Sequence, residues 1–134
     1  MIRLTSVFVA ATLVVSTAAV AKPPLREVKE INDPLYWALV AYELSEHCDT
    51  LEPRKLKGAA DGWGLVRKAR KLGYTDDEIK AFIKSDEEKA RMRARGEAFL
   101  KHKGVSLDNQ ESVCALGRAE IERNSAIGVY LRAK

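Results

Sequence analysis

The sequence predicts an all-α fold, a compact bundle of about five helices held by one disulfide. Apolar residues recur at spacings of three and four along most of the chain, which is the period of an amphipathic helix. Several of these runs are preceded by Ser, Thr or Asp with Glu three residues later, the pattern of a helix N-terminus. No run alternates apolar and polar residues over the length of a strand.

The first 21 residues have the pattern of a secretory signal peptide. Arg3 is their only charged residue, and the apolar stretch Val7–Val15 follows it. Ala19 and Ala21 form the A-x-A pattern that signal peptidase recognises, so we expect cleavage before Lys22. The apolar stretch is shorter than the ~20 residues of a permanent membrane anchor. We therefore expect a periplasmic or secreted protein that does not span a membrane after cleavage.

Length and charge restrict the organisation further. The chain has 134 residues, with 23 Lys and Arg against 19 Asp and Glu. This mildly basic balance is far from that of a nucleic-acid-binding tail, and we expect no nucleic-acid partner. The length suits one domain. We expect a signal peptide at 1–21, an extended segment at 22–32 and a single helical domain at 33–134.

The first helix should begin with Asp33 as N-cap and Pro34 at the first helical position, and end near Cys48. A second helix is predicted around 56–69, and Gly73 is its stop signal. Its apolar positions, at spacings of three and four, are Leu56, Ala59, Ala60, Trp63, Val66 and Ala69. Three glycines within it favour a kink or break at 61–64, because each costs about 1 kcal/mol relative to Ala.

The third helix has the strongest start signal. Thr75 and Glu78 form a capping box, and Tyr74 and Ile79 stand at the positions of a hydrophobic staple. The inward residues of this helix are expected to be Ile79, Phe82 and Ile83.

Ser85 and Glu88 repeat the capping box and predict the start of a fourth helix. Its inward stripe should include Met92, Ala98 and Phe99. Gly104 should end it, with Val105 folded back on Leu100 in a Schellman motif.

The fifth helix is predicted to begin at Asp108, with Glu111 completing a capping box, and to run to about residue 131 as the longest helix. One stripe of it carries Gly117, Ile121, Asn124 and Gly128. Because glycine lets a neighbouring backbone approach closely, we expect both glycines of this stripe to face another helix.

Cys48 and Cys114 are the only cysteines, and in an oxidising compartment an even number predicts a disulfide. Three other uses remain open. A redox enzyme would need closely spaced cysteines with a lowered pKa. A zinc site could combine both cysteines with His47 and His102, although the spacing matches no zinc motif. A Cys–His nucleophile would need a free thiol within reach of His47.

Glu120 and Asn124 adjoin the apolar stripe of the fifth helix and are a candidate buried polar pair. The alternative is that Glu120 serves a cell-wall-directed hydrolase, which would use a carboxylate pair in acid–base catalysis. Most other acidic residues stand in the first turns of helices, where capping and the helix dipole explain them.

Basic residues concentrate on the second and fourth helices and form a candidate binding face. Its members are Arg67, Arg70, Lys71, Lys89, Arg91, Arg93 and Arg95. Such a face would attract an acidic protein or an anionic envelope surface. The alternative is an ordinary solvated surface.

Several stretches resemble an uncharacterised family of small exported bacterial single-domain proteins, grouped as a domain of unknown function. They are AKPPL at 21–25, SDEEKARMRARGEAFL at 85–100, CALGRAEI at 114–121 and IGVYL at 127–131. The resemblance implies a secreted helical protein and supplies no catalytic residue.

We therefore expect an exported, periplasmic helical protein that acts by binding an unknown protein or the envelope surface, in an envelope-associated or chaperone-like role. We assign it no catalytic residue, metal or cofactor. The alternative is a cell-wall-directed hydrolase that uses a carboxylate on the last helix.

Overall fold

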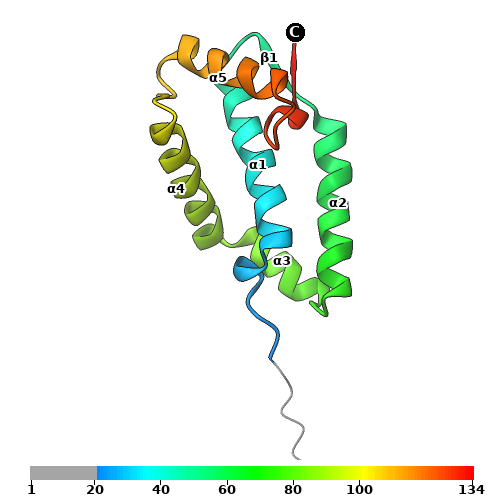
Figure 1. Ribbon diagram of the computed structural model, residues 1–134. Coiled ribbons are helices and arrows are strands. Elements are labelled where there is room, and N and C mark those ends of the chain that lie inside the picture. Colours follow the sequence, from blue (N-terminus) through cyan, green and yellow to red (C-terminus); the bar gives the residue numbers. More distant parts are fainter. Residues whose placement is uncertain (1–20) are drawn as a thin grey trace, which may run out of the picture.

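The computed structural model describes residues 21–134, and the predicted signal peptide lies outside these residues except for Ala21. Within the described part, five α-helices confirm the predicted all-α class: α1 (Lys29–Glu46), α2 (Lys55–Lys71), α3 (Asp76–Lys84), α4 (Asp86–His102) and α5 (Gln110–Glu122). α1 lies between α2 and α4; α3 connects them at one end, and α5 crosses the other (Figure 1). No helix in residues 21–134 combines the length and apolar character needed to cross a bilayer.

α1 begins at Lys29, earlier than predicted, and Pro34 lies inside it. The cause is the packing of the segment that precedes it, where Leu25 opens a short 3-10 helix, η1 (Leu25–Glu27). The buried side chain of Asn32 donates from Nδ2 to the carbonyl oxygens of Leu25 and, at 3.0 Å, of Val28. These bonds tie the first turn of α1 to the segment before it and add to the backbone bonds that the same carbonyl groups accept.

α2 is continuous from Lys55 to Lys71, so the predicted break at 61–64 does not occur. Its predicted apolar stripe is only partly inward. Ala69 is buried, whereas Leu56 and Trp63 are exposed. α2 packs through Leu65, Val66 and Ala69 against α3 and against the segment that precedes α1, which we call the lead-in (residues 22–28). Leu56 and Trp63 lie outside this contact and face solvent.

The predicted start of α3 is confirmed. The Thr75 hydroxyl accepts from the Glu78 N–H at 3.2 Å, and the Glu78 carboxylate accepts from the Thr75 N–H at 2.7 Å. Tyr74 and Ile79 are both buried, as a hydrophobic staple requires. Ile83 was expected inside but is 56% exposed.

In α4, the Ser85 hydroxyl accepts from the Glu88 N–H at 3.2 Å, but the Glu88 carboxylate pairs with arginines and does not complete the box. Ala98 is exposed, contrary to expectation, because it lies on the side of α4 that faces away from the core. The C-terminus is as predicted: Gly104 has φ +69°, and the Val105 N–H donates to the Leu100 carbonyl at 2.9 Å.

α5 is much shorter than predicted. Asn109, not Asp108, caps its start by accepting from the Ser112 N–H at 3.1 Å. Asn124 adopts a left-handed φ of 48° and ends the helix, and the Ser125 N–H donates to the Glu120 carbonyl at 3.1 Å. The Asn124 N–H also donates to the Ile121 carbonyl at 2.9 Å, and the two bonds with this torsion form the Schellman pattern, with Asn in place of Gly.

The chain then reverses through a second 3-10 helix, η2 (Gly128–Tyr130), into strand β2 (Leu131–Ala133). β2 pairs antiparallel with β1 (Leu51–Pro53), so that Leu51 stands opposite Ala133. This small ribbon was not expected from the sequence. It carries Leu51 and Leu131 into the main core, which gathers around α1 and α5.

Both glycines of the predicted fifth-helix stripe make close approaches, as expected. A Cβ on Gly117 would collide with the side chain of Leu51 in β1, and one on Gly128 would collide with the backbone of Glu120 in α5. For Gly117 the predicted helical partner is wrong, because the neighbour belongs to the ribbon. Gly128 does face a helix, but that helix is α5 itself, because α5 ends before Gly128 and the chain turns back against it.

Candidate functional site

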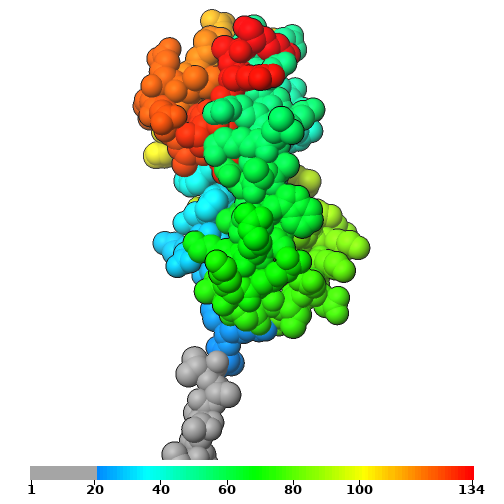
Figure 2. Space-filling view, turned by 90° about the vertical axis from the view of Figure 1, so that its right-hand side faces the viewer, coloured from blue at the N-terminus to red at the C-terminus, as the bar shows by residue number. Residues whose placement is uncertain are grey.

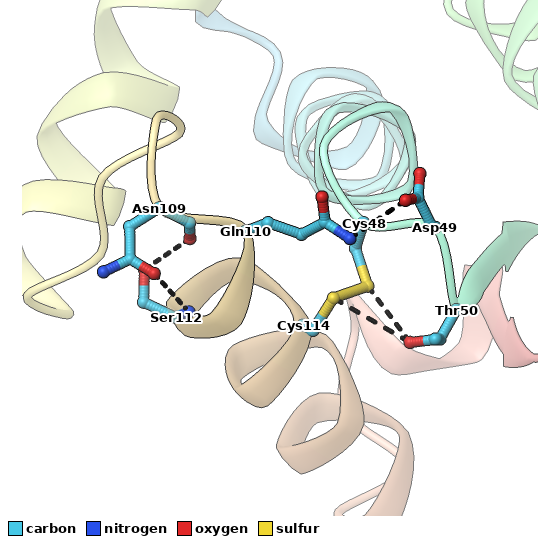
Figure 3. Close-up of a disulfide and its surroundings, with 7 residues drawn as sticks. All are labelled: Cys48, Asp49, Thr50, Asn109, Gln110, Ser112 and Cys114. Carbon is cyan, nitrogen blue, oxygen red and sulfur yellow. Dashed lines mark hydrogen bonds between the residues drawn. A yellow bond between two sulfur atoms is a disulfide. The ribbon is translucent and has the colours of Figure 1, made fainter.

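The predicted disulfide joins Cys48, just past the end of α1, to Cys114 in the first turns of α5 (Figure 3). The two Cα atoms are 5.3 Å apart, and the side chains are almost fully buried. The Thr50 hydroxyl lies 3.3 Å from the Cys48 sulfur. Because both sulfurs are bonded to each other, neither is a thiolate that could act as a nucleophile or zinc ligand. A disulfide is typical of proteins in oxidising compartments outside the cytoplasm.

The candidate polar pair on α5 does not form. Glu120 is buried and pairs with Arg123, one turn further along the helix. Asn124 is exposed, because its left-handed conformation turns the chain away from the helix. Glu120 lines neither of the two hollows described below, nor a third between α1, α2 and α3.

The basic residues predicted as one face are divided between two places. α2 and α4 lie on either side of α1, so their cations do not converge (Figure 1). On α4, Arg91 donates to Asn32 at 2.9 Å and to buried Glu88 at 2.8 Å. Arg95 pairs with Asp33 at 3.1 Å and stacks over the Tyr36 ring. These two arginines hold the fold together and are not available as a free binding face.

The cations of α2 are less engaged. Lys68 pairs with Glu30 at 3.1 Å and Arg70 with Asp76 at 2.7 Å, in both cases on exposed side chains. Arg67 and Lys71 form no ion pair within residues 21–134, and both are exposed. Of the predicted basic residues on this helix, these two are the ones free to meet an external anion.

Exposed apolar side chains accompany these cations on α2. Leu56 is 90% exposed and Trp63 is 64% exposed. They stand two helical turns apart and so lie on one side of the helix, with Arg67 one turn beyond. Figure 2 views the molecule from the right-hand side of Figure 1, where α2 runs down the centre of the visible face. We refer to Lys55, Leu56, Trp63, Arg67 and Lys71 as the α2 surface.

A hollow of about 630 Å³ adjoins the Leu56 end of the α2 surface. Its charged lining comes from the end of α1, from β1 through the first turn of α2, and from β2 with the adjacent Lys134. The charged residues are Arg54, Lys55, Lys57, Arg132, Lys134, Glu46 and Glu52. Cations are therefore in excess at this end as well, and the apolar side chains of the α2 surface lie between two positively charged regions.

The only carboxylate on α2 is neutralised internally. Asp61 accepts from Lys57 at 2.7 Å and from the Tyr130 hydroxyl at 3.0 Å, and these bonds lower its pKa. Burial and the bond to Asp61 raise the pKa of Tyr130 to about 12. Both groups therefore keep their ordinary charge at neutral pH, and Asp61 does not oppose the attraction of an anion to the free cations of α2.

The composition of α2, in contrast to its apolar periodicity, indicates an exposed helix. α2 holds six Lys and Arg against one Asp, together with three glycines. A helix of that composition is a weak candidate for a core element, since it offers few large apolar side chains to bury. Leu56 and Trp63 of its apolar stripe accordingly remain on the surface of the fold.

Comparison with curated proteins and with solved structures finds no match. Comparison with protein families finds one that covers most of the chain. Residues 23–132, which include all five helices and the disulfide, match the family described as "Family of unknown function (DUF5333)". The chain belongs to this family.

Proposed function

We propose that the protein is an exported binding protein that docks on the anionic lipid surface of the envelope through the α2 surface. The observation that carries the proposal is the exposure of Leu56 and Trp63 on one side of a helix whose free charges are all positive. An aromatic ring and an aliphatic side chain flanked by Lys and Arg are typical of helices that lie in a membrane interface.

The energetics favour a membrane surface as the partner. Trp places its ring at the headgroup level, where one edge stays hydrated and the rest is buried. Each Lys or Arg near an anionic surface contributes about 1 kcal/mol, and the effect declines within a Debye length. Lys55, Arg67 and Lys71 flank the two apolar side chains, so charge attraction and apolar burial act on the same contact. Neither contribution alone is large, which predicts reversible, salt-dependent binding.

Two features support an extracytoplasmic setting. The Cys48–Cys114 bond requires an oxidising compartment to persist. Lys22, the residue after the predicted cleavage site, already contacts the fold: its Nζ donates to the Gly73 carbonyl at 2.8 Å. Cleavage before Lys22 would therefore leave this contact between the N-terminal segment and the rest of the fold intact.

The proposal is tested by co-sedimentation with vesicles of phosphatidylcholine, with and without phosphatidylglycerol. We expect binding only to the anionic vesicles and its loss as salt rises. The variant Arg67→Glu with Lys71→Glu should abolish binding.

The matched control is Lys101→Glu with Arg118→Glu, which makes the same change in net charge at exposed residues of α4 and α5. This control should bind anionic vesicles much more strongly than the α2 variant. Equal loss in both variants would mean that only net charge matters, and absence of wild-type binding at low salt would refute the proposal. Binding to an acidic protein but not to vesicles would replace the lipid surface with a protein partner.

A further inference from the structure

A second surface, separate from α2, is an apolar hollow bounded by α1, α3 and α4. It has a volume of about 440 Å³. Leu39 and Tyr42 of α1 and Ile83 of α3 border it and are 45%, 48% and 56% exposed. So much apolar area at one place on a small domain is typical of a protein–protein contact.

The α4 side of the hollow is unusually open. Gly96 lines it beside Met92, and a Cβ placed on Gly96 would meet no atom within 4 Å. A small residue at this position lets a second helix approach the α4 backbone closely. The fold itself does not use that space, although glycine inside a helix is less favourable than alanine by about 1 kcal/mol.

The charges along the hollow follow a definite order. α1 and α4 run in the same direction. Arg91 of α4 contacts Asn32 of α1, and one turn further along both helices the Arg95 carbonyl accepts from the Tyr36 hydroxyl at 3.2 Å. The cations Lys89 and Arg93 therefore lie toward one end of the hollow.

The carboxylates Glu97 and Glu43 lie toward the other end, and Gly96 stands between the two pairs. Arg93 and Glu97 form no ion pair within residues 21–134. Lys89 donates to Asp86, which is 98% exposed, at 3.3 Å and to the Lys84 carbonyl at 3.4 Å, and Glu43 lies 3.3 Å from His47. Lys89 and Glu43 are therefore held only by contacts at the surface, which a partner with complementary charges can replace.

We propose that this hollow is the interface of a symmetric dimer, in which a second copy of the chain packs against it about a two-fold axis near Gly96. A two-fold axis reverses the order of charges along the hollow, so the basic end of one copy meets the acidic end of the other. The apolar residues between them are then covered, and no charge of the four is left opposite a like charge. The proposal goes beyond membrane binding and uses different residues.

The test is a charge exchange, followed by sedimentation velocity and native mass spectrometry of the purified protein. One variant carries Lys89→Glu and Arg93→Glu, and the other carries Glu43→Lys and Glu97→Lys. Each should weaken self-association by at least about ten-fold, because every cross-pair becomes a like-charge pair. Mixed in equal amounts, the two variants should form a heterodimer, because the exchanged charges are again complementary.

A steric test compares Gly96→Leu, whose side chain would start at the lining of the hollow, with Gly58→Leu on α2. A Cβ at either position meets no atom within 4 Å. Only Gly96→Leu should lower dimer formation, and thermal melts should show both variants folded. A wild-type protein that stays monomeric at about 100 μM, far above the dissociation constant of a specific dimer, would overturn the proposal. A dimer that both charge variants leave intact would also overturn it. A monomer that binds an unrelated helix at this hollow would overturn it too, and would assign the hollow to another partner.

Discussion

Arg91 of α4 donates from Nη2 to Oδ1 of Asn32 in α1 at 2.9 Å, and this bond joins two helices that are 59 residues apart in sequence. Asn32 is buried, and its Nδ2 donates to two carbonyl groups of the preceding segment. One amide therefore connects the lead-in, α1 and α4. The same bond removes Arg91 from the basic face that the sequence predicted.

Replacing Asn32 by Leu should lower the free energy of unfolding by about 1–3 kcal/mol, because the buried amide's bonds to the Leu25 and Val28 carbonyls are lost and Arg91 loses its Asn32 acceptor. Urea unfolding measures the change. The exposed Gln110→Leu serves as a control for added apolar character, and a similar stability of both variants would contradict the role given to Asn32.

Reduction of the Cys48–Cys114 bond should lower the melting temperature clearly. The bond closes a long loop, with a sequence separation of 66, for which the chain-entropy model gives about 4 kcal/mol. Cys114→Ser should melt like the reduced protein and be insensitive to reductant. An unchanged melting temperature after complete reduction would show that the bond contributes little to stability.

The two close-packed glycines should respond differently to substitution. A methyl group on Gly128 meets backbone atoms of Glu120, whereas one on Gly117 meets the end of the Leu51 side chain, which can shift. Gly128→Ala should therefore destabilise more than Gly117→Ala, while Gly117→Leu should cost roughly 1–3 kcal/mol by overpacking. Thermal melts rank the three variants, and a milder effect at Gly128 would mean that the returning chain yields easily.

Local signals in the sequence predicted the starts of α3 and α4 and the end of α4, because a cap depends on residues that are neighbours along the chain. The ends that failed depend on distant contacts. The start of α1 follows from burial of Asn32 against the lead-in, and the exposed face of α2 follows from which side of it meets the other elements. Asn124 did carry a local signal for the end of α5, since Asn is the usual alternative to Gly at that position.

The residue types of the candidate site were predictable from the sequence, but which of these residues stay free on the surface was not. A basic α2 was foreseen, and Arg67 and Lys71 remain free in the structure. Arg91 and Arg95 could not be excluded from the sequence, because their partners Asn32 and Asp33 lie about sixty residues away and meet them only after folding. The exposure of Trp63 likewise becomes visible only once α2 is packed.

Acid should destabilise the protein through three carboxylates. Bonds from cationic side chains lower the pKa of each: Lys57 to Asp61, Arg70 to Asp76 and Lys22 to Glu78. A carboxylate whose folded pKa is lowered contributes stability above its ordinary pKa and loses it as pH falls through the folded value. Melting temperature should therefore fall as the pH drops below about 4, and Asp76→Asn should flatten this dependence. A melting temperature that stays constant down to about pH 2 would contradict it.

The most direct test of membrane docking is the fluorescence of Trp63 in a Trp37→Phe background, since Trp37 packs against Phe99 and would otherwise add a constant signal. Titration with vesicles containing phosphatidylglycerol should shift the Trp63 emission to shorter wavelength, and brominated lipid should quench it. Vesicles of phosphatidylcholine alone should do neither. An emission maximum that stays unshifted and unquenched with anionic vesicles at low salt would contradict the account, because Trp63 would then remain in water.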